Sequence, residues 1–191
     1  MDNFNISCFL DKLVLSIKNV DENYFQIPTA YEPDGISRER VFCYELYHQF
    51  RMILGNDYPF SLHGELDKSG HISFPPELQG IPDFLLHKPG THDGNMVIME
   101  VKGRLDPDNI ILDFRKINRF ISHPEIHYQY GVFLIYNFSI ENIMNRRVYE
   151  LFRNVPQETD QKIYLISALR NKRNECVSLS LIREYMNKIF S

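Results

Sequence analysis

The chain has 191 residues, of which 43% are hydrophobic and 13% aromatic, so it can bury one sizeable core, and we expect a single domain over residues 1–191. Its formal net charge of −4 argues against a uniformly basic nucleic-acid-binding protein, although a local basic strip is compatible with that charge. Net charge alone therefore does not decide the class of partner.

Localisation can be predicted from cysteine usage and hydropathy. The cysteines are odd in number, far apart and in no CxxC pair, so neither a disulfide framework nor a zinc or iron–sulfur site is expected. No apolar run approaches the roughly 18 residues that a membrane span needs, and the amino-terminal residues lack the basic start of a signal peptide. These features predict a soluble, cytoplasmic protein without a membrane partner.

The amino-terminal part predicts two helices followed by short strands. An apolar, helix-like stretch lies in the first 20 residues, and the turn sequence YEPDGIS ends at Ser37, which we expect to cap a helix from about Arg38 to Leu54. The segments SLHGEL (61–66) and HISF (71–74) are predicted to be strands around the turn DKSG.

A hairpin and a helix are predicted next. The runs IPDFLLH (81–87) and MVIMEVK (96–102) flank a loop rich in Pro, Gly, Asp and Asn, which is typical of a β-hairpin. Asp106 is expected to cap the helix that follows, with Pro107 at its first position. The apolar stripe of this helix consists of Ile110, Phe114, Ile117 and Ile121.

The rest of the chain alternates strands with helices. YGVFLIYN (130–137) and KIYLISAL (162–169) are predicted strands, whereas IENIMNRRVYELF (140–152) and SLIREYMNKIF (180–190) are predicted helices. This alternation predicts an α/β architecture in which helices cover a sheet.

The predicted hairpin brings charged side chains together. A loop centred near residues 91 and 92 places Asp83 opposite Glu100. Period-two alternation puts Lys102 and Ile98 on the face of Glu100 and sends their neighbours to the other face; these neighbours are Val97, Met99 and Val101. Two carboxylates and an ammonium group therefore converge on one face.

Two interpretations of this convergence stay open. Opposed carboxylates destabilise a sheet unless a cation joins them, which favours a Mg²⁺ site with Lys102 positioned to hold or deprotonate an attacking water. The alternative is a cross-strand salt bridge on a solvated face, in which Lys102 neutralises Asp83 and Glu100.

The helix at 38–54 offers a third acid. Glu45 borders the apolar stripe of this helix, and Gln49 lies one turn later, so the two side chains either form a hydrogen bond on the helix surface or point at the same site. Glu39 competes with Glu45 for this role, but it lies near the helix start, where a carboxylate is stabilised by the helix macrodipole.

These residues resemble the motif of the PD-(D/E)xK nuclease superfamily. The matching positions are Glu45 in a first helix, Pro82 and Asp83 at one strand, and Glu100, Val101 and Lys102 in the next. The resemblance covers residues 37–136 and implies a restriction-endonuclease-like core, a central mixed sheet flanked by helices in the order helix, three strands, helix, strand. Residues 1–36 would then be an amino-terminal helical extension and residues 137–191 a carboxy-terminal helix–strand–helix extension.

The resemblance also implies a role for each position. Asp83 and Glu100 would bind Mg²⁺ or Mn²⁺, and the backbone carbonyl of Val101 would complete the ligand set. Lys102 would orient or activate water, and Glu45 would contact the metal directly or through water. Gln49 and His87 are accessory candidates, the latter because alternation puts it on the Asp83 face.

A nuclease needs a surface for nucleic acid, and the helix after the hairpin supplies one candidate. Arg115, Lys116 and Arg119 lie off its apolar stripe and either contact phosphates or form a solvated helix face. The resemblance favours DNA over RNA as the partner, and a role in restriction, repair or defence. The chain's acidity and small size favour a protein partner or a homodimer. The second hypothesis is a non-catalytic nuclease-fold subunit that acts as an interaction or nucleic-acid-binding module.

Overall fold

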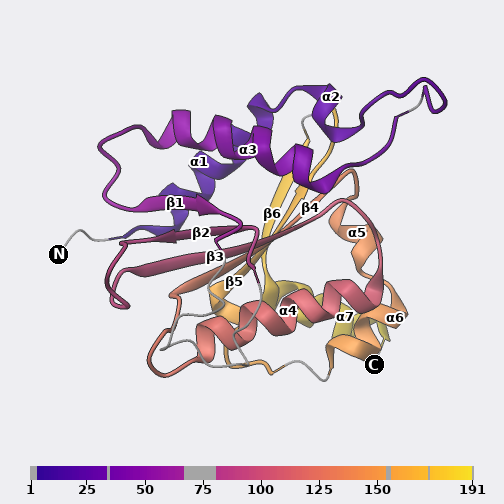
Figure 1. Cartoon of the computed structure of the whole chain (residues 1–191). Helices are drawn as coiled ribbons and strands as arrows, with labels where there is room; N and C mark the ends of the chain where they lie inside the picture. The colour runs from indigo at the N-terminus through magenta and orange to yellow at the C-terminus, as the bar shows by residue number, and fades with distance from the viewer. Residues whose placement is uncertain (1–3, 34, 67–80, 154–155, 172, 191) are drawn as a thin grey trace.

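One mixed sheet organises the protein (Figure 1). The computed structural model describes residues 4–33, 35–66, 81–153, 156–171 and 173–190. Within these ranges the sheet has six strands in chain order, namely β1 (Ser61–Gly64), β2 (Phe84–His87), β3 (Asn95–Lys102), β4 (Tyr130–Tyr136), β5 (Ile163–Ala168) and β6 (Asn174–Ser178). β2 is antiparallel to both of its neighbours, β1 and β3, whereas β4 and β5 run parallel to β3, and β6 is antiparallel to β5.

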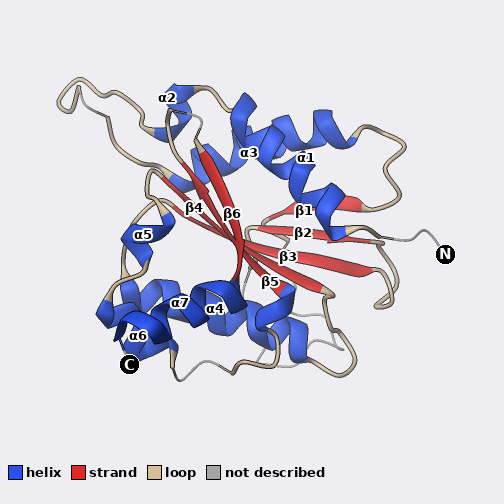
Figure 2. Ribbon diagram, turned by 180° about the vertical axis from the view of Figure 1, so that it is seen from behind, coloured by secondary structure: helices blue, strands red, loops and turns tan. Residues whose placement is uncertain are grey.

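Helices cover both faces of this sheet (Figure 2). On one face lie α1 (Ile6–Asn19), α2 (Glu22–Phe25) and α3 (Glu39–Leu54). On the other lie α4 (Pro107–Ser122), α5 (Ile140–Ile143), α6 (Arg146–Phe152) and α7 (Leu179–Phe190). Each face buries its own apolar cluster against the sheet, so the expected α/β architecture is confirmed.

The hairpin of β2 and β3 has the predicted register. Phe84 pairs with Met99 and Leu85 with Ile98, so continuing this register by one pair brings Asp83, the residue before β2, opposite Glu100. Strand alternation is confirmed as well, because Ile98 packs in the α4-side cluster while its neighbours Val97 and Met99 pack in the α3-side cluster. The site therefore opens on the face that α4 covers.

The predicted helix caps have mixed outcomes. Asp106 caps α4 as expected, since its side chain accepts hydrogen bonds from the backbone N–H groups of Asp108 and Asn109. The prediction that Ser37 caps α3 is wrong, because Arg38 occupies the N-cap position and its side chain forms no capping hydrogen bond. The Ser37 hydroxyl instead donates to the Tyr136 hydroxyl on β4, at 2.7 Å.

The carboxy-terminal elements also differ from expectation. The single helix predicted over 140–152 is two helices, because Asn145 breaks it and its side chain accepts a hydrogen bond from the N–H of Val148 at the start of α6. β6 was not predicted, since it is a polar, half-buried edge strand without a clear apolar alternation. The predicted strand HISF and the turn DKSG lie outside the described residues. None of the helices in the described ranges has both the length and the apolar character that crossing a membrane requires.

Candidate active site

Asp83, Glu100 and Lys102 lie together at the end of β3, as the hairpin register predicted. Asp83 accepts a hydrogen bond from the backbone N–H of Val101 across the hairpin, 2.7 Å from Oδ2. Glu100 is only 1% exposed, and its Oε1 atom is buried without a hydrogen-bond partner among the described residues. A buried carboxylate oxygen without a partner is costly, so this atom points to a missing cation or donor.

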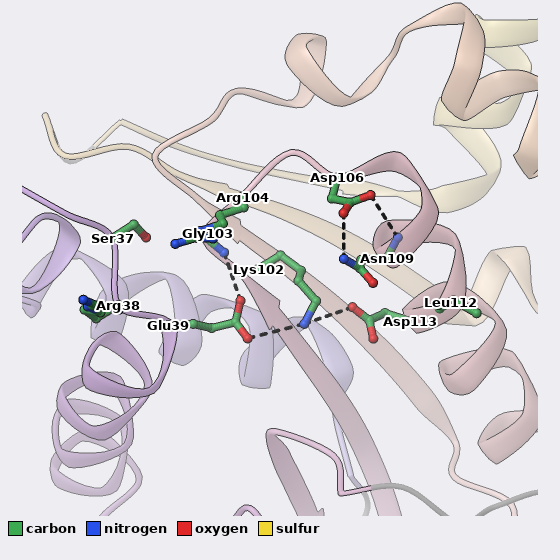
Figure 3. Close-up of a pocket in the computed structure, with 10 residues that line it drawn as sticks. All are labelled: Ser37, Arg38, Glu39, Lys102, Gly103, Arg104, Asp106, Asn109, Leu112 and Asp113. Carbon is green, nitrogen blue, oxygen red and sulfur yellow. Dashed lines mark hydrogen bonds and ion pairs between the residues drawn. The ribbon is translucent and has the colours of Figure 1, made fainter.

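Two helices supply further acids around Lys102 (Figure 3). The Nζ atom of Lys102 lies 3.1 Å from Oδ2 of Asp113 on α4 and 3.4 Å from Oε1 of Glu39 on α3. Glu39 also accepts a hydrogen bond from the backbone N–H of Gly103 at 3.2 Å, which fastens the start of α3 to the end of β3. Lys102 is thereby held in one orientation by elements from both faces of the sheet.

A second lysine completes the arrangement. The Nζ atom of Lys116 on α4 lies 2.8 Å from Oε2 of Glu100 and 3.6 Å from Oδ1 of Asp113. We call these six side chains the acidic cluster; they are Glu39, Asp83, Glu100, Lys102, Asp113 and Lys116. Four carboxylates face two ammonium groups, so the fully ionised cluster carries an excess of two negative charges.

Burial raises the proton affinity of two of these carboxylates, and the neighbouring charges modify that effect. Burial raises the pKa of Glu100 to about 8, with a further contribution from the charge of Asp83, and Lys116 only partly opposes them. Burial likewise raises the pKa of Asp83 to about 6 against the opposing effects of the Val101 N–H group and Lys102. Without a metal, Glu100 therefore holds a proton at neutral pH, which reduces the negative charge of the cluster, whereas Asp83 is mostly ionised there.

Lys102 responds in the opposite direction. Burial acts to lower the pKa of its ammonium group, but the carboxylates of Asp113, Glu39 and Asp83 outweigh burial and raise the pKa above its ordinary value. In the metal-free protein the Lys102 side chain is therefore protonated and donates hydrogen bonds. Its ammonium group is a weaker acid than that of an ordinary lysine, and it does not act as a base in this state.

Glu45 does not join the acidic cluster. Its Oε1 atom accepts a hydrogen bond from Gln49 Nε2 at 2.6 Å, which is the helix-surface alternative for this pair. Glu39 and Glu45 are six residues apart, about 120° around the helix axis and about 9 Å along it. Because α3 begins beside the end of β3, its first residue reaches the cluster while Glu45 faces elsewhere.

Other predicted residues lie outside the cluster too. His87 follows a register shift in β2, and its Nε2 atom lies 2.7 Å from Nδ1 of His63 on the neighbouring strand. Arg115 and Arg119 are exposed on α4, and the Arg119 side chain bonds to the backbone carbonyl of Arg115. Of the three basic residues predicted on this helix, Lys116 points into the cluster.

Sequence reasoning did not select Asp113. A signal for it existed, because an acid three residues after Ile110 and four before Ile117 lies within the apolar stripe of α4. Such a buried acid requires a partner, but the sequence does not indicate that the partners are Lys102 and Lys116.

A divalent cation bound at the acidic cluster would have few protein ligands. Within the described ranges, no group of three or more acidic, histidine or cysteine side chains is arranged to hold a metal ion. Mg²⁺ commonly uses one or two carboxylates and completes its shell with water and substrate oxygens. Asp83 and Glu100 meet that smaller requirement, and the charge excess and the unpartnered Glu100 oxygen favour a cation beside them.

Comparison of the chain with protein-family models, with curated proteins and with solved structures gives no match. What the site can do chemically therefore has to be inferred from the residues of this chain alone.

Close packing behind the cluster leads to a first prediction. A Cβ atom at Gly103 would lie 2.3 Å from Cζ and Oη of Tyr136 and 2.5 Å from Oγ of Ser37. Gly103→Ala should therefore destabilise the protein by about 1–3 kcal/mol, because the Ser37–Tyr136 hydrogen bond has to move. Urea denaturation measures this change. Gly64→Ala is the matched control, since its Cβ would meet only ordinary contacts from 3.6 Å outward, and an equal loss in both variants would contradict the packing argument.

Proposed function

We propose that this protein is a divalent-metal-dependent nuclease of the PD-(D/E)xK type with a restriction-endonuclease-like core, acting on DNA in preference to RNA. The observation that carries the proposal is the acidic cluster, in which a buried oxygen of Glu100 lacks a partner and carboxylates outnumber ammonium groups by two. The helix, three strands, helix, strand order from α3 to β4 is the order that the resemblance implies. The preference for DNA rests on the resemblance.

Asp83 and Glu100 would hold Mg²⁺ or Mn²⁺ together with the backbone carbonyl of Val101. The bound cation would polarise the scissile phosphate and lower the pKa of a water molecule. Asp83 is oriented for this role by the Val101 N–H group, which bonds to one of its two carboxylate oxygens. Glu100 would offer the cation its unpartnered Oε1 atom, while Lys116 contacts Oε2 of the same carboxylate.

Lys102 would position the attacking water and stabilise charge on the phosphate. Glu39 and Asp113 hold its ammonium group from two sides, so they act as positioning residues. In the hydrolysis the water oxygen forms a bond to phosphorus and the bond from phosphorus to the leaving oxygen breaks. The leaving oxygen takes the electron pair and a proton, and the water supplies that proton through the solvent or Lys102.

The second candidate is a nuclease-fold subunit without turnover. It is favoured by the observation that Lys102 and Lys116 already pair with Glu39, Glu100 and Asp113. In this reading the cluster is a structural ion-pair network, and the protein serves as an interaction or nucleic-acid-binding module.

An activity assay separates the two candidates. Purified protein is incubated with single-stranded, duplex and branched DNA and with RNA in EDTA, Mg²⁺ or Mn²⁺. A nuclease should cleave at least one substrate with metal and none in EDTA. Cleavage in none of these conditions, from protein that is folded by circular dichroism, would favour the non-catalytic subunit.

Two substitutions in α3 test which helix acid supports the reaction. Glu39→Gln should lower kcat by about 10- to 100-fold, because Lys102 loses a charged partner that orients it. Glu45→Gln should change kcat little, since Glu45 contacts Gln49 and not the cluster. Steady-state cleavage rates measure both effects. The reverse order of effects would restore the sequence-based assignment to Glu45.

A further inference from the structure

A pocket of about 550 Å³ opens beside the acidic cluster (Figure 3). It lies between the start of α3, the end of β3 and the first turns of α4. Its charged lining residues are Arg38, Glu39, Lys102, Arg104, Asp106 and Asp113. Three members of the acidic cluster, Glu39, Lys102 and Asp113, thus form one wall of a space large enough for part of a nucleic-acid strand.

The acids that line this pocket already have partners. Glu39 and Asp113 bind Lys102, and Glu39 also accepts from the Gly103 N–H group. Asp106 caps α4 and accepts a further hydrogen bond from the side chain of Asn109 at 2.8 Å. Each of these carboxylates therefore contacts an ammonium or an N–H group within the described residues.

The two arginines of the pocket differ from the acids in this respect. Arg38 and Arg104 are exposed, and neither guanidinium group forms a hydrogen bond or an ion pair with another residue in the described part of the chain (Figure 3). Some exposed arginines elsewhere do pair, as Arg40 does with Glu65 and Arg147 with Asp108. Two uncommitted guanidinium groups therefore flank a pocket that contains Lys102.

We infer that Arg38 and Arg104 hold phosphate groups of the nucleic-acid strand on either side of the phosphodiester presented to Lys102. This inference rests on the proposed nuclease function. A guanidinium group is a planar fork of donors that matches phosphate oxygens bidentately, and it stays charged at every physiological pH. Their position places the substrate strand over the pocket at the end of β3, rather than along the exposed face of α4 that carries Arg115 and Arg119.

Binding measurements test this assignment independently of cleavage. Fluorescence anisotropy with a labelled oligonucleotide, single-stranded and as a duplex, is recorded over a range of salt concentrations in EDTA and in Ca²⁺. The Arg38→Ala/Arg104→Ala variant should bind about 10- to 100-fold more weakly. Its log–log salt slope should be less negative by about 0.7 per lost phosphate contact on single strands, or about 0.9 on duplex DNA.

Matched variants give the comparison. Arg38→Lys/Arg104→Lys should keep the parent's salt slope and lose part of the affinity, because a lysine retains the charge but not the fork. Lys18→Ala/Arg51→Ala also removes two positive charges, but it removes them from the last turns of α1 and α3. This variant should bind like the parent. Melting curves confirm that each variant is folded.

The outcomes separate the inference from the proposed function. A parent that binds and cleaves while Arg38→Ala/Arg104→Ala keeps its affinity and slope overturns the inference but leaves the nuclease standing. The same holds if Arg115→Ala/Arg119→Ala flattens the slope instead. A parent that neither binds nor cleaves any of the nucleic acids overturns both.

Discussion

Asp83→Asn should abolish metal-dependent hydrolysis and leave the metal-free protein at least as stable as the parent. The asparagine keeps an oxygen that can accept from the Val101 N–H group, so the hairpin contact at 2.7 Å is preserved. It removes a buried carboxylate whose pKa is raised to about 6 by burial, and thus relieves repulsion within the acidic cluster. Stability and activity are therefore expected to change in opposite directions.

Melting curves of parent and variant in EDTA and Mg²⁺ measure both effects. Mg²⁺ at 100 times its dissociation constant should stabilise the parent by about 2.7 kcal/mol, or about 5–10 °C for a chain of this size. Asp83→Asn should lose most of that shift. Asp83→Ala is the control for the hairpin contact, because it leaves the Val101 N–H group unpaired and should cost about 1–3 kcal/mol. A metal-free loss in Asp83→Asn, together with no Mg²⁺ response in the parent, would leave only the salt-bridge interpretation.

Raising the pH should weaken the metal-free fold and strengthen Mg²⁺ binding, both through Glu100. Burial raises the pKa of Glu100 from its ordinary 4.5 to about 8 in the folded protein. Below pH 4.5 the carboxyl group is protonated in both the folded and the unfolded chain and contributes no penalty. Between pH 4.5 and 8 the unfolded chain ionises first, so the stability that this group contributes is lost as the pH rises.

Glu100→Gln tests this contribution because it removes the titrating carboxyl group and keeps a polar side chain of the same size. In EDTA the melting temperature of the parent should fall relative to the variant by several degrees between pH 5 and 8.5, since each pKa unit corresponds to about 1.4 kcal/mol. Mg²⁺ requires the ionised carboxylate, so parent affinity measured by calorimetry should rise over the same range with release of protons. Melting curves that stay parallel across this range would show that burial does not perturb Glu100.

Local sequence patterns were sufficient to predict the hairpin that carries the site. Loop length sets which residues face each other, and period-two alternation sets the face, so the proximity of Asp83, Glu100 and Lys102 could be predicted without any tertiary information. The α4 helix was equally predictable, since Asp106 and Pro107 mark its start by local hydrogen bonding and backbone geometry.

Residues contributed by the helices could not be assigned in this way. Helical periodicity indicates which side of α3 is buried, but not which turn of the helix lies against the end of β3. The sequence therefore favoured Glu45 at the edge of the apolar stripe over Glu39, whose position in the first turn is explained by the helix macrodipole. The docking of α3 on the sheet decided for Glu39, and its contacts with Lys102 and Gly103 make this visible.

The α/β class, the hairpin and the three charged side chains on its face were predictable from local patterns, because these follow from contacts between residues close along the chain. The acids and cations that complete the cluster depend on how the helices pack on the sheet. Glu39 lies 63 residues from Lys102 in the chain, and Asp113 and Lys116 reach the site only because α4 packs across this face of the sheet. Contacts between residues so far apart in the chain depend on how whole helices pack on the sheet. Local periodicity in the sequence does not specify this packing.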